Sequence, residues 1–141
     1  MLSERFDAAL TYAHALHRAQ TRKGGSVPYI AHLLSVAALV IEHGGDEDQA
    51  IAALLHDGPE DQGGEATLAD IQARFGEKVA EIVADCSDTF ETPKPAWVER
   101  KRRYLRHLEH TSKASLLVSL ADKVHNAEAV AEDFRALDKH V

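Results

Sequence analysis

The sequence predicts an all-α protein that folds as one compact helical bundle. Its 141 residues suit a single domain with a sizeable core, and 45% of them are hydrophobic, which is ordinary for a globular protein. Leucine, alanine, glutamate, arginine and aspartate dominate, whereas β-branched residues are sparse and aromatic residues make up 6% of the chain. This composition favours helices over strands. Apolar residues also recur at helical spacing, in segments separated by loops that contain glycine or proline.

The first helix is expected to begin after Ser3, a good N-cap residue, and its apolar stripe runs from residue 6 to residue 19. His14 and His17 lie within it. We interpret both as surface or rim histidines, because neither belongs to a compact set of metal ligands. Residues 20–27 predict a loop that is basic at first and then rich in glycine.

The second helix is expected to have Pro28 in its first position and to end at Gly44-Gly45. It is apolar nearly all round, which is typical of a buried helix. Asp46 begins a third helix, and residues 51–55 of that helix form another apolar run. Both helices should therefore lie in the core.

The second half of the chain predicts four more helices. Thr67 is the expected cap of a short helix that ends at Phe75, and two further helices cover about residues 79–86 and 97–110, with a loop over residues 87–96. The last helix is expected to begin at Ser112 or Thr111 and is almost continuously apolar as far as Val124. The helix over residues 97–110 is strongly charged, so its contacts should come from its few apolar side chains. These are Trp97, Val98, Tyr104, Leu105 and Leu108.

Four ionisable residues follow the buried end of the third helix: His56, Asp57, Glu60 and Asp61. Adjacent His and Asp residues on a helix point about 100° apart, so both can reach one ion near the helix end. Gly58-Pro59 then disrupts the helix, after which Glu60 and Asp61 could face the same cleft. The alternative interpretation is a helix C-terminus with a solvated acidic tail.

Two further polar residues lie inside apolar helices. His32, in the second helix, needs a partner there, and taken alone it would be interpreted as a hydrogen-bonded core histidine. Asp122 lies in the almost continuously apolar last helix, and a buried aspartate without a partner is rarer. With His56 and Asp57, these residues offer two imidazoles and two carboxylates. Such a set suits Mn, Fe or Zn better than Ca, and it would leave open positions on one hydrolytic divalent ion.

With these residues the sequence resembles the HD-domain phosphohydrolases, whose ordered motif is H…HD…D. More narrowly, it is similar over almost the whole chain to the hydrolase domain of the RelA/SpoT family and to the stand-alone small alarmone hydrolases. Five segments carry the resemblance: Arg22-Lys23 before Pro28-Tyr29-Ile30-Ala31-His32, Ala53-Leu54-Leu55-His56-Asp57 with Glu60-Asp61, Phe75-Gly76 before Val79, Glu99-Arg100-Lys101, and Leu120-Ala121-Asp122-Lys123 with Asn126.

The resemblance implies an HD-domain helical bundle with a metal site between buried helices. It implies one manganese ion on the ligands His32, His56, Asp57 and Asp122. It also implies that Glu60 and Asp61 orient or deprotonate the attacking water. The implied reaction is hydrolysis of the 3′-pyrophosphate of an alarmone such as (p)ppGpp, with release of pyrophosphate.

The same resemblance implies that the nucleotide is held by Arg22 and Lys23, with Tyr29 and Asn126 nearby. From the residues alone, Arg22 and Lys23 are either the cationic end of the first helix or two cations that a flexible loop presents to a nucleotide. The formal charge of −7 argues against a broad nucleic-acid surface, but a phosphorylated nucleotide in a local basic pocket remains compatible with it.

The chain departs from the family pattern in three places. Gly58-Pro59 stands where the guanosine enzymes usually carry Thr or Ala and then Val, and Gln62-Gly63-Gly64 replaces the more usual Thr after Glu-Asp. The base is therefore open between adenosine and guanosine. Family members also generally continue beyond the position of Val141 through another helical segment that helps close the pocket. Two other functions stay open: an HD-type phosphatase on ordinary nucleotides such as dNTPs or NADPH, and a catalytically silent module that binds a nucleotide and regulates a partner.

We expect a cytoplasmic protein that has no membrane partner. The chain opens with no basic-then-apolar signal peptide, and no apolar run reaches membrane-spanning length. The single cysteine, Cys86, excludes an intrachain disulfide framework and suits a reducing compartment. We interpret Cys86 as a small core residue. The sequence predicts no particular oligomeric state.

Overall fold

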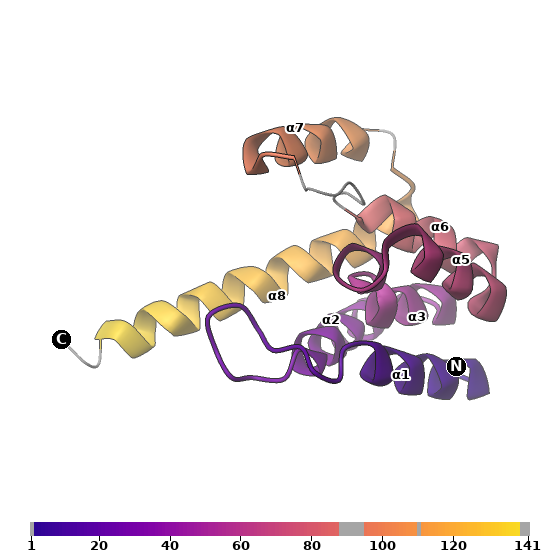
Figure 1. Cartoon of the computed structure of the whole chain (residues 1–141), viewed down its shortest axis with the longest axis horizontal. Coiled ribbons are helices and arrows are strands. Elements are labelled where there is room, and N and C mark those ends of the chain that lie inside the picture. Colours follow the sequence, from indigo (N-terminus) through magenta and orange to yellow (C-terminus); the bar gives the residue numbers. More distant parts are fainter. Residues whose placement is uncertain (1, 88–94, 110, 139–141) are drawn as a thin grey trace.

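The computed structural model describes residues 2–87, 95–109 and 111–138, and for this part of the chain the all-α prediction is confirmed (Figure 1). The helices are α1 (Glu4–Leu16), α2 (Ile30–Glu42), α3 (Glu47–Leu55), α4 (Gly58–Asp61), α5 (Gly64–Phe75), α6 (Glu77–Cys86), α7 (Trp97–Leu108) and α8 (Lys113–Asp138). The described residues form no strand, and an isolated antiparallel bridge pairs Thr21 with Pro28. No helix in these ranges is long and apolar enough to cross a membrane.

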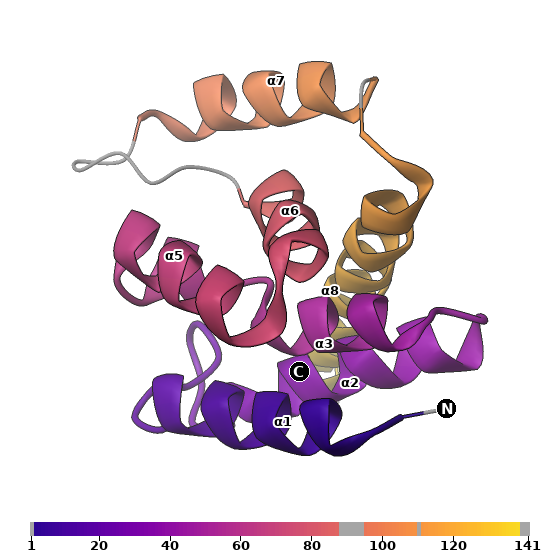
Figure 2. The same ribbon diagram turned by 90° about the vertical axis from the view of Figure 1, so that its right-hand side faces the viewer.

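Helix α3 lies at the centre of the core. It contacts α1, α2, α6 and α8, and its residues from Ala50 to Leu55 are each 0% exposed. Burial of each large aliphatic side chain there contributes about 2 kcal/mol to stability. Figure 2 shows α3 between α1 on one side and α6 on the other. The residues that follow Leu55 therefore emerge in the middle of the core.

Local sequence signals set the starts of α1 and α3 as predicted. The Ser3 hydroxyl oxygen accepts a hydrogen bond from the backbone N–H of Arg5 at 3.2 Å. Asp46 Oδ1 accepts from the backbone N–H of Gln49 at 2.9 Å, and Gln49 Oε1 accepts from the backbone N–H of Asp46 at 2.8 Å. These bonds satisfy backbone donors that the first helical turn leaves without partners.

Two predicted helix starts are wrong. Pro28 precedes α2 and does not occupy its first position, because the N–H of Tyr29 still donates to the carbonyl of Gln20 (2.9 Å) and closes the preceding loop. Thr67 lies inside α5, where its hydroxyl donates to the carbonyl of Gln62. The turn into α5 is made instead at Gly63, whose φ of 97° is readily adopted only by glycine.

The predicted apolar contacts of α7 are wrong for three of its side chains: Trp97, Val98 and Leu105 are 64%, 53% and 62% exposed. Helix α7 lies apart from the packed helices (Figure 2), so its apolar residues have no core to enter among the described residues. Its contacts with the body include the hydrogen bond between Tyr104 and Ser119. The side chain of Leu108 lies outside the described residues.

Helix α8 runs from Lys113 to Asp138 and so continues well beyond the apolar run that predicts it. Its first half packs on α2, α3 and α6, whereas its second half projects from the body (Figure 1). The projecting half is rich in good helix formers, and its large apolar side chains Val130, Phe134 and Leu137 are 55%, 67% and 64% exposed. It therefore extends the helix without extending the core. Most of the predicted loop over residues 87–96, namely residues 88–94, lies outside the described part of the chain, as does His110.

Candidate metal centre

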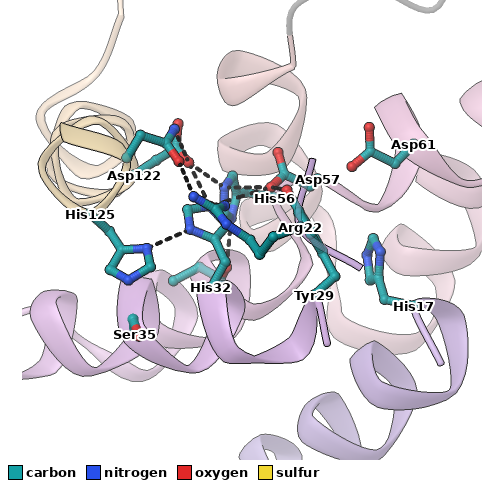
Figure 3. A network of polar contacts seen from close by, with 12 residues as sticks. His17, Arg22, Tyr29, His32, Ser35, His56, Asp57, Asp61, Asp122 and His125 are labelled. Atoms are coloured by element: carbon teal, nitrogen blue, oxygen red, sulfur yellow. Dashed lines mark hydrogen bonds and ion pairs between the residues drawn. The ribbon is translucent and has the colours of Figure 1, made fainter. Parts of the chain in front are cut away.

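Four side chains from separate parts of the core converge on one point (Figure 3). His32 comes from α2, His56 caps the end of α3, Asp57 follows it, and Asp122 comes from α8. One nitrogen or oxygen ligand atom of each lies within 4.8 Å of the others. The two imidazoles are 1% exposed and Asp122 is 8% exposed. This group could bind a divalent metal ion, as its donor types predict.

The break between α3 and α4 places His56 next to Asp57 at this point. Pro59 is the second residue of α4 and has no N–H with which to continue the α3 ladder. Gly58 allows α4 to pack closely against α1, since a Cβ added there would lie 3.0 Å from Leu16 Cδ2. The predicted helix break is confirmed, and the chain continues at once as the short helix α4.

The ring of His56 is held in one orientation. Its Nδ1 lies 2.7 Å from the carbonyl oxygen of Ala53, which can only accept, so Nδ1 carries the proton and donates. In the neutral ring this leaves the Nε2 lone pair 3.1 Å from Asp57 Oδ2 and 3.1 Å from Asp122 Oδ1. Three electron-rich atoms thus face one another, an arrangement that a cation stabilises.

The ring of His32 is held in a similar way from its far side. Its Nε2 lies 2.9 Å from Asp122 Oδ1 and 3.6 Å from Asp57 Oδ2. Its Nδ1 lies 2.7 Å from Nδ1 of His125, which is on α8 one turn beyond Asp122 (Figure 3). A hydrogen bond to the far nitrogen of a histidine fixes the ring and aims the near nitrogen at an ion.

The pKa shifts in the group all favour positive charge beside the two carboxylates. Burial opposes the imidazolium of His56, but Asp57 and Asp122 outweigh burial and raise the pKa of His56 well above its usual value. Burial also opposes the charged form of Asp57, yet His56 holds the pKa of Asp57 below its usual value. Burial is likewise outweighed at Asp122, where hydrogen bonds from His32 and His56 lower the pKa strongly. A divalent cation satisfies the same preference.

Three further side chains hold the carboxylates from outside the group. The hydroxyl of Tyr29 donates to Asp57 Oδ2, and burial together with the charge of Asp57 raises the pKa of Tyr29 far above its usual value, so the phenol remains a donor. Lys123 Nζ donates to Asp122 Oδ2 at 3.0 Å, and Asn126 Nδ2 donates to Asp122 Oδ1 at 3.4 Å. Each carboxylate is therefore oriented before any ion binds.

Two cavities adjoin the group and share Tyr29, Asp61 and Asn126 in their walls. The smaller, of about 200 Å³, is lined mainly by polar residues: Asp57, Glu60, Lys101, Tyr104, Asp122 and Lys123, together with Cys86. The larger, of about 940 Å³, includes the loop from Gln20 to Gly25. Small-molecule sites usually measure about 300–1,000 Å³, so the larger cavity has room for a nucleoside and the smaller has room for phosphate groups.

The structure brings every predicted site residue to this group or to these cavities. Glu60 and Asp61 line the smaller cavity beside the two carboxylates of the group. Arg22 and Lys23 line the larger cavity, and Tyr29 and Asn126 lie where the two cavities meet. Within the described residues, the predicted site residues from the loop over residues 20–27 and from α2, α4, α8 and the end of α3 therefore lie together.

The sequence profile of the HD domain matches residues 9–140. The chain belongs to the HD-domain family. The predicted resemblance to this family is therefore confirmed.

Relatives of this HD domain carry names that describe alarmone hydrolysis. The guanosine-3′,5′-bis(diphosphate) 3′-pyrophosphohydrolase MESH1 of Xenopus tropicalis is 40% identical over 121 residues, which are 84% of this chain and 65% of that protein. Human MESH1 is 37% identical with the same coverage. The bifunctional (p)ppGpp synthase/hydrolase SpoT of Escherichia coli K12 is 35% identical over 87% of this chain and 18% of SpoT. The chain thus spans 65% of the length of the MESH1 proteins.

A solved structure gives the same result. The structure of a metazoan ortholog of SpoT, described as hydrolysing ppGpp and playing a role in starvation responses, superposes on this HD domain with a TM-score of 0.78. The match covers 88% of this chain and 68% of that one, at 32% identity.

Two histidines of this HD domain lie beside the site without having been predicted there. His17 is not a surface residue, because it is 2% exposed: α1 ends at Leu16, and the following turn carries the imidazole inward to within 5.2 Å of the Tyr29 ring, centroid to centroid. His125 received no role from the sequence. Its spacing of one helical turn from Asp122 is the signal that could have identified it.

Cys86 packs against the core, as predicted, and also lines the smaller cavity. Burial raises the pKa of its thiol to about 12. The side chain is therefore a protonated thiol at neutral pH and a poor nucleophile.

Proposed function

We propose that this HD domain is a metal-dependent phosphohydrolase that removes the 3′-pyrophosphate of a nucleotide alarmone, (p)ppGpp or its adenosine analogue, and releases pyrophosphate. The observation that carries the proposal is the buried group of His32, His56, Asp57 and Asp122 at the junction of a phosphate-sized and a nucleoside-sized cavity. The names of the relatives support the substrate class. Manganese as the ion and the cytoplasm as the location are predictions from the sequence that the proposal retains.

In the proposed reaction, the phosphate chain occupies the smaller cavity. A divalent ion held by the four ligands would polarise a phosphoryl oxygen and lower the pKa of water. Glu60 and Asp61 orient the attacking water and take its proton, because both line this cavity next to the ligands. The water oxygen bonds to the phosphorus attached to the ribose 3′-oxygen, the bond from that phosphorus to the 3′-oxygen breaks, and the carboxyl group that took the water proton returns it to the 3′-oxygen. Lys101 and Lys123 line the same cavity and offset the negative charge of the phosphate groups.

The test is pyrophosphate release with Mn²⁺ against a panel of ppGpp, ppApp, NADPH and dNTPs. The proposal expects pyrophosphate from ppGpp or ppApp, and the better of the two identifies the base. Orthophosphate release from NADPH or dNTPs would favour an HD-type phosphatase instead. Nucleotide binding without turnover of any compound in the panel would favour a catalytically silent regulatory module instead.

Arg22 is proposed to bind the nucleotide without taking part in the chemistry. Its Nη2 donates to Asn126 Oδ1 at 3.2 Å, and its guanidinium carbon lies 6.0 Å from the centre of the Tyr29 ring. Arg22→Lys loses the planar fork but keeps the charge. We expect KM to rise several-fold while kcat stays within a few-fold, as when uniform binding is lost. Arg18→Lys, at an exposed position outside the larger cavity, is the control for steady-state kinetics. A collapse of kcat at constant KM would instead show that Arg22 stabilises the transition state.

His125 is proposed to position His32 for metal binding through the hydrogen bond between their Nδ1 atoms. His125→Phe keeps a planar ring but removes this bond, so Mn²⁺ affinity should fall about 10- to 100-fold, the usual effect of losing such a partner. Calorimetric titration of the metal-free protein with Mn²⁺ measures the change. The exposed His14, changed to Phe, provides the control. Equal affinity in the two variants would remove His125 from the metal centre.

A further inference from the structure

His17 is a buried histidine outside the four-ligand group. It is 2% exposed, whereas His14, one turn earlier in α1, is exposed. Its ring lies against the ring of Tyr29, with 5.2 Å between centroids and 36° between planes. Figure 3 places the imidazole beneath Asp61, on the side of Tyr29 that faces away from His32. The residue therefore touches the site without belonging to the ligand set.

A chain of hydrogen bonds links His17 to Asp61 through Gln20. Gln20 Nε2 donates to Asp61 Oδ2 at 3.1 Å. Gln20 Oε1 lies 2.7 Å from His17 Nδ1 and accepts from Gln62 Nε2 at 3.0 Å. These hydrogen bonds thus join the end of α1 to the end of α4 along the wall of the larger cavity, which Gln20 and Asp61 line.

The direction of each bond in this chain is fixed by chemistry. A carboxylate only accepts, so Asp61 must face the NH₂ group of Gln20 and not its oxygen. The Gln20 oxygen then faces His17, and His17 must donate from Nδ1. Within the described residues, the other ring nitrogen, Nε2, is buried with no hydrogen-bond partner. Burying Nε2 without a partner is energetically unfavourable. The polar contact that the buried ring makes in this part of the chain is the one from Nδ1 to Gln20.

Asp61 is the residue that gains from this arrangement. It is exposed to both cavities and ends a helix of only four residues, so its own helix does little to hold it in place. An exposed carboxylate samples several rotamers unless a bond restrains it. The buried ring of His17 supplies a rigid anchor, and Gln20 carries that restraint to the carboxylate.

We propose that His17 and Gln20 are positioning residues that aim the Asp61 carboxylate at the attacking water. The inference rests on the proposed function, in which Asp61 orients that water. His17→Phe keeps the ring and its packing but removes the donor. His17→Asn restores a donor, because the amide nitrogen of Asn occupies the same place along the side chain as Nδ1. We expect His17→Phe to lower kcat about 10-fold with KM and Mn²⁺ affinity unchanged, and His17→Asn to recover most of the loss.

A double-mutant cycle with Asp61→Asn separates positioning from a general packing role. Once Asp61 is an amide, its side chain can donate or accept, and the hydrogen bonds through Gln20 no longer aim a carboxylate. His17→Phe should therefore cause no further loss of kcat in the Asp61→Asn background. Gln20→Met, a change at a half-buried position, should reproduce both results if His17→Phe fails to fold. His14→Phe is the matched control. Equal losses in the wild-type and Asp61→Asn backgrounds, or no loss in either, would overturn the proposal.

One further measurement does not depend on turnover. Long-range ¹H–¹⁵N NMR of the wild-type protein should show the neutral His17 ring protonated at Nδ1, and in Gln20→Met this preference should disappear. A ring protonated only at Nε2 would show that His17 does not donate to Gln20, whether or not the protein hydrolyses an alarmone. Conversely, the expected ring state in a protein that releases no pyrophosphate from the panel would reject the proposed function and leave the hydrogen-bonded chain intact.

Discussion

Asp122→Asn is expected to lose divalent-ion binding and, with it, the proposed release of pyrophosphate. One oxygen of Asp122, Oδ1, lies 2.9 Å from His32 Nε2 and 3.1 Å from His56 Nε2, so this carboxylate joins the two imidazoles. The amide removes a negative charge at a position that is 8% exposed, where little solvent can compensate. Loss of a residue that only hydrogen-bonds to a ligand typically weakens metal binding about 10- to 100-fold. Loss of the ligand Asp122 itself should therefore weaken Mn²⁺ binding by more than roughly 100-fold.

Three measurements check this prediction. Metal content after dialysis against Mn²⁺ should be near zero in the variant, and pyrophosphate release should fall to background. Mn²⁺ should also raise the thermal stability of the wild-type protein but not that of the variant, because a ligand that binds only the native state stabilises it. Asp7→Asn makes the same chemical change at an exposed site in α1 and should match the wild type. Full metal occupancy in Asp122→Asn would refute the ligand assignment.

The residues of the four-ligand group could be predicted because each breaks a local pattern. His32 and Asp122 interrupt apolar helices, and His56-Asp57 follows the apolar run over residues 51–55. A buried polar group needs a partner, and several such groups in one chain can serve as partners for one another. The N-cap of α1 and the capping box of α3 were predictable for a different reason, since their hydrogen bonds join residues no more than three apart.

The features that the sequence did not predict depend on contacts between distant segments. The burial of His17 requires Tyr29, which lies on the far side of the loop over residues 20–27. The exposure of Trp97 and Leu105 depends on where α7 lies relative to the core, and amphipathic spacing alone does not determine this. The start of α5 was misjudged because Thr67 has the local signature of a cap, whereas the positive φ of Gly63 sets the turn.

The position of α4, which carries the proposed catalytic carboxylates Glu60 and Asp61, could be predicted only in part. Gly58 and Pro59 could be recognised as a helix break from the sequence. Only the structure reveals that the chain resumes at once as a helix and that Gly58 lies against Leu16. This close approach carries Glu60 and Asp61 to the smaller cavity, beside Asp57 and Asp122. The proposed nucleotide base would lie in the larger cavity, where the loop over residues 20–25 forms much of the wall.

Glu60→Gln is expected to keep the metal and the substrate while lowering kcat roughly 100-fold or more, the usual scale for a general acid–base group. Glu60 lines the smaller cavity but is not one of the four clustered ligands, and glutamine has nearly the same size and shape. The variant should therefore bind Mn²⁺ and nucleotide normally, yet its neutral amide cannot take a proton from water. Single-turnover kinetics on the best substrate of the panel, with calorimetric Mn²⁺ binding, separates these effects. The exposed Glu65, changed to Gln, is the control. Normal turnover would remove Glu60 from the mechanism, and loss of Mn²⁺ together with turnover would move it into the ligand set.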